Sequence, residues 1–142
     1  MGGLGNGWTY ALLSAVFAAA TAVLAKTGVK DVPSNLATAI RTAVVLIFAW
    51  GLVLATGEVR ELSKVTTRSW TFLALSGVAT GLSWIAYFKA LSLAPASRIA
   101  PIDKLSLPIT IVLAAVVLRE PVTPKMGAGI ALIVGGTFLT MR

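Results

Sequence analysis

The chain has 142 residues, of which 57% are hydrophobic and only 12% are charged, and its net charge is +7. A soluble domain carries about 25% charged residues, so this chain has too few polar side chains to cover a water-facing surface, which excludes a soluble fold. Cysteine and histidine are both absent, which excludes disulfides, thiol nucleophiles, histidine bases and Cys/His metal sites.

The remaining polar residues argue against catalysis. The 5 acidic residues are too few and too scattered for a carboxylate metal site, so we expect no enzyme activity, no cofactor and no bound metal. In a soluble protein the positive charge would indicate nucleic-acid binding. Here the Lys and Arg residues cluster in short gaps between apolar runs, which is typical of residues that flank membrane helices and meet anionic headgroups. We therefore expect a lipid bilayer as the surroundings and no nucleic-acid partner.

Five apolar runs follow one another along the chain, each with about the 17–25 residues that a helix needs to cross the hydrocarbon. The runs cover residues 8–25, 36–56, 70–93, 98–118 and 124–141. The expected fold is an all-α integral membrane protein with five transmembrane helices in a single domain, residues 1–142. Helix caps are predicted at Ser34, Ser69, Ser97 and Thr123, the last of which is followed by Pro124.

Five crossings would place the two termini on opposite sides and divide the basic loop residues almost evenly. On the N-terminal side lie Arg60, Lys64, Arg68, Arg119 and Lys125. On the other side lie Lys26, Lys30, Arg98 and Arg142. The positive-inside rule therefore selects no orientation. Two interpretations stay open: dual topology with an antiparallel homodimer, which reproduces the inverted repeat of many transporters, or one orientation set by the translocon or a partner.

Four ionisable residues lie inside the predicted helices, where each is costly and needs a reason. Arg41 lies about 9 Å into the second helix at 1.5 Å per residue, Lys89 lies near the end of the third, and Asp103 and Lys104 lie near the start of the fourth. These helix ends face one side of the membrane, so the four residues are predicted to line a substrate site that favours an anionic or zwitterionic group. The alternative is structural: Arg41 and Lys89 snorkel to the interface, and Asp103 pairs with one of them.

Two prolines interrupt the fourth run, and helix kinks are predicted at both. Pro101 and Pro108 each free the carbonyl four residues earlier, and Pro108 frees that of Lys104. A freed carbonyl in lipid needs protein or a watered cavity, so a charged, partly unwound segment is predicted, as in many transporter sites. The alternative is an ordinary kink repaired by Ser106 or Thr110.

Aromatic side chains follow one stripe of the third helix. Trp84, Tyr87 and Leu91 share this stripe, and Phe88 lies beside it. We assign Trp84 and Tyr87 to the substrate cavity next to Lys89. Helix packing or lipid contact is the alternative for these rings.

Small residues mark a stripe on the last helix. Gly127, Ala131 and Gly135 repeat every four residues and allow two backbones to approach closely. This stripe is the predicted subunit interface.

Several segments with a recognisable order and spacing are spread over nearly the whole chain. They are Lys26-Thr27-Gly28, Ala37-Thr38-Ala39-Ile40-Arg41-Thr42, Tyr87-Phe88-Lys89-Ala90-Leu91 with Ala94-Pro95-Ala96-Ser97 and Ala100-Pro101, and Leu118-Arg119-Glu120-Pro121-Val122-Thr123-Pro124 running into Gly127 and Gly135-Gly136. Together they resemble the EamA family. The family often has an L-G-E turn at the last of these segments, so Arg119 stands where a glycine is usual.

The resemblance implies the drug/metabolite transporter superfamily, whose usual member has ten helices in two inverted five-helix domains. This chain would be one half of such a transporter, in a bacterial inner or archaeal cell membrane. We expect a secondary transporter, typically an exporter, of a small polar or anionic metabolite that works as a homodimer, with any proton coupling through Asp103. Two alternatives stay open: a flippase for a lipid-linked anionic headgroup, and a non-transporting accessory subunit. A cation pump of the small multidrug type is disfavoured because residues 8–25 hold no carboxylate.

Overall fold

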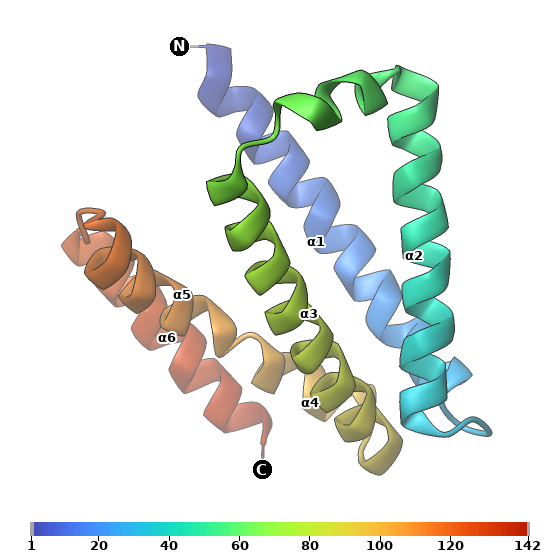
Figure 1. The fold of residues 1–142 in the computed structure, drawn as a ribbon. Coiled ribbons are helices and arrows are strands. Elements are labelled where there is room, and N and C mark those ends of the chain that lie inside the picture. The colour runs from blue at the N-terminus through green and yellow to red at the C-terminus, as the bar shows by residue number, and fades with distance from the viewer. Residues whose placement is uncertain (1, 142) are drawn as a thin grey trace. The chain divides into compact units, whose positions relative to one another are not determined.

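The computed structural model of the chain describes residues 2–141, with side chains from residue 7 onward, and every regular element in that range is helical (Figure 1). The elements are α1 (Gly2–Gly28), α2 (Ser34–Thr56), the 3-10 helix η1 (Glu58–Lys64), α3 (Thr67–Leu93), α4 (Ala96–Asp103), α5 (Ser106–Leu113), the π-helical turn η2 (Ala114–Leu118) and α6 (Pro124–Thr140). Arg142, which entered the count of basic residues above, lies outside the described residues.

Large apolar side chains point outward along these helices. Trp8 is 71% exposed, Phe48 76% and Leu132 77%. In water such a surface marks an interaction site or an aggregation hazard, whereas lipid tails solvate it. Among the residues that the structure describes, four segments are long and apolar enough to cross a membrane: Gly7–Gly28, Ser34–Thr56, Thr67–Leu93 and Ala96–Leu118. The chain is therefore an all-helical, multi-pass membrane protein.

The fifth predicted span, α6, is shorter. Its 17 residues make a helix of about 26 Å at 1.5 Å per residue, slightly less than the ~30 Å of hydrocarbon. The predicted start is confirmed: the hydroxyl of Thr123 accepts the N–H of Met126 at 3.3 Å, and Pro124 is the first helical residue. That α6 crosses the membrane, and with it the five-helix count and the inverted pairing, stays a prediction.

Three of the predicted caps are wrong, those at Ser34, Ser69 and Ser97. Pro33 precedes α2 and Pro95 precedes α4, and among the described residues neither helix start has a side-chain cap bond. At α3 the capping hydroxyl belongs to Thr66, which accepts the N–H of Ser69 at 3.2 Å. Proline fixes its own φ near −65°, so it ends the extended loop without a capping side chain.

The fourth apolar segment is interrupted at Lys104 and Leu105, between the end of α4 and the start of α5. The N–H of Lys104 donates to the carbonyl of Pro101 at 3.1 Å. The Lys104 carbonyl, which Pro108 deprives of its usual partner, accepts the N–H of Leu107 at 3.0 Å. The repair is therefore made by the backbone, and not by a serine or threonine hydroxyl as the ordinary-kink interpretation expected.

The structure divides into two compact units. The first spans Leu24–Leu93, and its core lies where the end of α1, the start of α2 and the end of α3 meet. Val29, Phe88 and Leu91 are buried there, with exposed fractions of 4% or less. At the far ends of α2 and α3, η1 connects the two helices (Figure 1). The core of this unit is thus concentrated at one end.

The second unit contains the chain up to Val23 and from Ala94 onward. In it α6 packs against both α4 and α5, which follow the same direction in Figure 1. Thr137 of α6 is buried, and its hydroxyl reaches the carbonyl of Pro101 at 3.2 Å. The last helix therefore holds the broken segment close to the first of its prolines.

Two of the described residues have positive φ: Gly57 at 74°, after α2, and Arg119 at 57°, after η2. The left-handed region costs a residue with a Cβ about 1–2 kcal/mol, and glycine avoids this cost. The turn at Arg119 is closed by a hydrogen bond from the N–H of Glu120 to the carbonyl of Ala114 at 3.3 Å. This backbone geometry explains why a glycine suits the position that Arg119 occupies.

Candidate functional site

A cation–π contact in the first unit joins α2 to α3. Arg41 lies two turns into α2, and its guanidinium carbon lies 4.2 Å from the centre of the Trp84 ring and 5.5 Å from that of Phe88. Trp84 and Phe88 are four residues apart on α3 and so share one helix face. Phe88 is buried, while Arg41 and Trp84 are half-buried. The side chain of Arg41 is therefore directed against α3.

The energetics make this contact relevant to a charge inside the membrane. An arginine at the centre of a membrane helix costs about 2.5–3.5 kcal/mol on insertion scales. A cation–π contact contributes about 0.5–1 kcal/mol at an exposed site and about 2 kcal/mol when desolvated, so the Trp84 ring offsets part of that cost. The guanidinium has five N–H donors in a planar fork, which can bind a carboxylate or phosphate with two parallel hydrogen bonds. Arg41 is thus well suited to hold an anion.

The other residues predicted on α3 are in the same unit. Tyr87 is half-buried and Lys89 is exposed near the end of the helix. Phe88, which the sequence placed beside the aromatic stripe, is the second ring that Arg41 contacts. Leu91, a member of the stripe, is fully buried in the core. The packing role is therefore confirmed at Leu91, whereas the assignment of Trp84 and Tyr87 to a substrate cavity stays a prediction.

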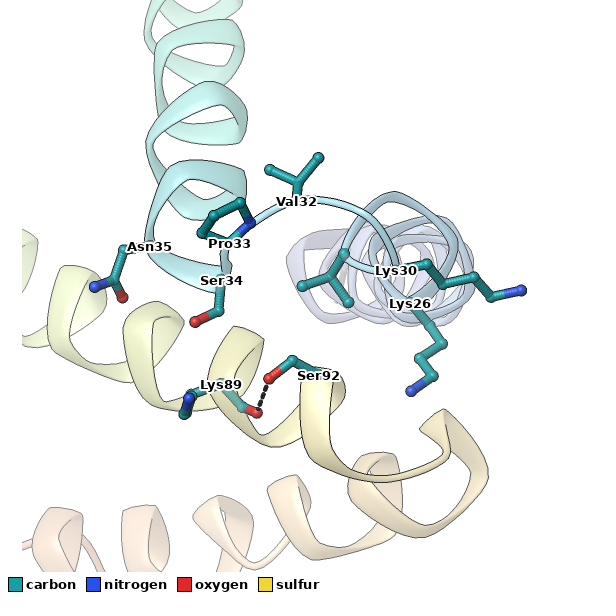
Figure 2. A pocket seen from close by; sticks show the side chains of 9 residues that line it. Lys26, Lys30, Val32, Pro33, Ser34, Asn35, Lys89 and Ser92 are labelled. Atoms are coloured by element: carbon teal, nitrogen blue, oxygen red, sulfur yellow. Dashed lines mark hydrogen bonds between the residues drawn. The ribbon is translucent and has the colours of Figure 1, made fainter.

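A cavity of about 610 Å³ lies where the end of α1, the start of α2 and the end of α3 meet (Figure 2). It is lined by Lys26, Val29, Lys30, Val32, Pro33, Ser34, Asn35, Lys89 and Ser92. We call this the lysine pocket. Sequence reasoning placed Lys89 in a site but treated Lys26 and Lys30 only as loop charges. The sequence did contain an indication of this grouping, since Lys26, Lys30 and Lys89 were all assigned to the same side of the membrane.

Two hydrogen bonds shape the lysine pocket. The ammonium of Lys26 donates to the carbonyl of Leu91 at 2.6 Å, which ties the end of α1 to the end of α3. The hydroxyl of Ser92 donates to the carbonyl of Lys89 at 2.7 Å, the dashed line of Figure 2. Cations near a helix C-terminus are favourable because the last carbonyls carry partial negative charge. The end of α3 therefore fixes one side of the pocket.

The remaining predicted binding residues belong to the second unit. The Nζ of Lys104 lies 3.8 Å from the Oδ2 of Asp103, and the two side chains are 53% and 42% exposed within the chain. An ion pair as open as this one contributes about 0–1 kcal/mol, so it leaves Asp103 available for other partners. Pro101 and Pro108 lie on either side of this pair. The six predicted substrate-binding residues are thus divided between the two units, and a single shared site stays a prediction.

The small-residue stripe of α6 is open along its length. Gly127, Ala131 and Gly135 are all exposed. A Cβ added at Gly127 or Gly135 would meet no other atom of the described chain within 4 Å. Nothing in this unit therefore occupies the stripe, and its use as a subunit interface stays a prediction.

Comparison with known proteins adds three findings. The sequence profile described as the EamA-like transporter family matches residues 5–142. A protein of a Sinorhizobium species, named "Uncharacterized transporter in cobO 3'region", is 46% identical over 137 residues, which cover 96% of this chain and 97% of that protein. No solved structure is significantly similar to the chain.

Proposed function

The chain belongs to the EamA-like transporter family, and on this basis we propose that it is a secondary transporter, acting as an exporter, of a small polar or anionic metabolite. It works as a homodimer in a bacterial inner or archaeal cell membrane. The observation that carries the proposal is Arg41, a guanidinium inside an apolar helix that is stacked on Trp84. An insertion cost of this size is usually associated with function.

The substrate contact follows from that arrangement. Trp84 and Phe88 position the guanidinium of Arg41, and its fork of N–H donors can bind a carboxylate or phosphate through two parallel hydrogen bonds. Arg41 is on α2, and Lys89, one residue beyond Phe88 on α3, adds a second positive charge. Transport requires the anion to bind and then to be released. The exposed ammonium of Lys89 and the single guanidinium of Arg41 allow release more easily than a site that encloses the anion on all sides.

The experiment is release from proteoliposomes that are loaded with a mixture of small anionic and zwitterionic metabolites, measured by mass spectrometry. We expect the chain to release at least one anion faster than empty liposomes do. Arg41→Gln should slow that release by at least about tenfold, because a lost hydrogen bond to a charged group costs about 1.5–3 kcal/mol.

The matched control is Arg68→Gln. Arg68 also lies over an aromatic ring, that of Phe72 at 5.9 Å, but in the first turn of α3. This variant should transport like the original protein. Release no faster than from empty liposomes, or equal losses in the two variants, would contradict the proposal.

Proton coupling is assigned to Asp103, which lies at the end of α4 beside the helix break. Asp103→Asn should remove the pH dependence of transport. Glu61→Gln is the control, because it removes an exposed carboxylate that pairs with Lys64 at 2.8 Å in η1. A pH profile that Asp103→Asn leaves unchanged would rule out this role.

The homodimer is proposed to be antiparallel, supported by the even division of basic residues between the two sides. Reporters fused after Arg142, one active only in the cytoplasm and one only outside, test this. Activity of both indicates insertion in both orientations. Activity of one alone would show a fixed orientation and refute the antiparallel pairing.

A further inference from the structure

The lysine pocket combines cationic and neutral polar groups around one cavity. Its lining includes Lys26, Lys30 and Lys89 together with Ser34, Asn35 and Ser92. Among the described residues that line it, none is acidic; Asp31, in the same loop, is exposed and is not part of the lining. The residues around the cavity therefore carry three positive charges and no negative one.

From this arrangement we infer that the lysine pocket binds a phosphate-bearing anion, and, resting on the proposed transport function, that it is the first contact of the substrate. A phosphate monoester carries about −1.5 to −2 charges near neutral pH and has three strong acceptor oxygens. Lysine binds phosphate as a point charge, so several ammonium groups can share one phosphate without a fixed geometry. A single carboxylate would leave more of this charge unbalanced.

The volume and the wall of the pocket fit an organic phosphate. The cavity of about 610 Å³ lies within the ~300–1,000 Å³ of small-molecule sites. Val29, Val32 and Pro33 form an apolar part of the lining, which suits the carbon portion of such a ligand. Val29 is itself buried in the core, so this wall is well supported.

The lysines differ in how they are held. Lys26 is half-buried and points toward the end of α3, where it donates to Leu91 (Figure 2). An ammonium has three N–H donors, so this bond positions Lys26 and keeps its charge in the pocket. Lys30 and Lys89 are exposed, and Lys30 extends outward in Figure 2. Its flexible four-carbon stem allows the ammonium to move over the opening of the cavity.

The pocket lies where apolar helices end, so a phosphate could reach it either from water or from the lipid headgroups. The spans Gly7–Gly28, Ser34–Thr56 and Thr67–Leu93 all begin or end beside it, and helix ends of this kind meet water and lipid headgroups. A soluble phosphate ester and the headgroup of an anionic lipid present the same chemistry there. The experiment must therefore separate them.

The test uses the full chain in nanodiscs. Binding of glycerol 3-phosphate is measured by calorimetry in nanodiscs of phosphatidylcholine alone. Retention of lipid is measured by native mass spectrometry of protein released from nanodiscs of phosphatidylcholine with phosphatidic acid. The variant is Lys30→Gln with Lys89→Gln, which keeps Lys26 and its bond to Leu91. The control is Lys125→Gln, which removes an exposed lysine in the first turn of α6.

We expect the double variant to bind its phosphate source at least about tenfold more weakly, since charge-assisted hydrogen bonds are lost, and the control to bind normally. Weakening with glycerol 3-phosphate identifies a soluble ester as the source; weakening only with phosphatidic acid identifies the lipid headgroup. If neither probe binds, or if the double variant binds both as the original does, the inference is overturned.

The outcomes also separate this inference from the proposed function. Binding that depends on the lysines, in a chain that releases nothing from proteoliposomes, would leave the phosphate site standing and remove the transporter. Transport that depends on Arg41, with no binding at the lysine pocket, would do the reverse.

Discussion

Thr137 on α6 donates a hydrogen bond from its hydroxyl to the carbonyl oxygen of Pro101 at 3.2 Å, across 36 residues of sequence. The same hydroxyl lies 2.9 Å from the carbonyl of Ile133 in its own helix. The carbonyl of Pro101 also accepts the N–H of Lys104 at 3.1 Å, so the single proton of the Thr137 hydroxyl, shared with Ile133, adds a second partner to it. The contact therefore ties α6 to the segment just before the helix break.

The first prediction concerns this contact. Thr137→Val keeps the shape and removes the hydroxyl, so the free energy of unfolding should fall by about 0.5–1.5 kcal/mol. Unfolding of the protein in mixed micelles, followed by tryptophan fluorescence, measures the change. Thr137→Ser keeps the hydroxyl and is the control. Equal stability of the valine variant and the original protein would show that the contact contributes nothing.

The second prediction concerns the stack of Arg41 on Trp84. A double-mutant cycle with Arg41→Gln and Trp84→Leu should give a coupling free energy of about 1–2 kcal/mol, because the pair is half-buried. The matched cycle uses Arg68 and Phe72, which are both exposed and 5.9 Å apart, and should give about 0.5 kcal/mol. Coupling of the same size in both cycles would mean that burial of the first pair has no energetic effect.

Periodicity and length predicted much of the fold. The five apolar runs correspond to helical segments, and the Thr123–Pro124 pair marks the start of α6 because its capping bond is local. The all-helical membrane class and the transporter family are confirmed. The local pattern was misleading at Ser34 and Ser97. Ser34 is already the first residue of α2, after Pro33, and Ser97 is the second residue of α4, so neither hydroxyl is placed to cap its helix.

The site was harder to predict because its contacts join distant residues. Lys26 and Leu91 are 65 residues apart in the sequence, so no local spacing indicates that the first loop borders the end of α3. Phe88 was placed beside the stripe, yet its ring is the second one that Arg41 contacts, after Trp84, because the packing of α2 on α3 decides which rings the guanidinium meets. The positions of Arg41 and Lys89 along their helices led to the prediction that both line a site, but these positions could not identify the residues that they contact.

The third prediction concerns the left-handed residue Arg119. Arg119→Gly removes the Cβ clash, worth about 1–2 kcal/mol, but raises the entropy of the unfolded chain by about 0.4–1 kcal/mol. We therefore expect a net gain in stability of about 0.5–1 kcal/mol from these two opposing terms. Thermal unfolding in detergent measures it. Arg119→Ala retains the Cβ and should show no gain, and a gain of equal size in both variants would point to the lost arginine rather than to the backbone.

The fourth prediction concerns the stripe on α6. Gly135→Leu should reduce the dimer fraction on a detergent sizing column and leave the helical content unchanged, because the position is open within the described chain and close helix approach needs small residues. Gly136→Leu is the matched control, since this neighbour is also open but lies about 100° around the helix from the stripe. An undiminished dimer in Gly135→Leu would refute the interface.

The buried contacts of the unit of residues 24–93 are concentrated at one end. Val29, Phe88 and Leu91 are buried at the end beside the lysine pocket, and the bond from Lys26 to Leu91 lies there too, whereas η1, at the other end, has no buried residue in the described chain. Local opening is easiest where few apolar contacts must break. Backbone amides of Glu58–Lys64 should therefore exchange with deuterium sooner than those around Leu91, and equal rates would contradict this. The end of the unit beside the lysine pocket is therefore expected to be its most rigid part, and η1, which links the far ends of α2 and α3, its most readily opened part.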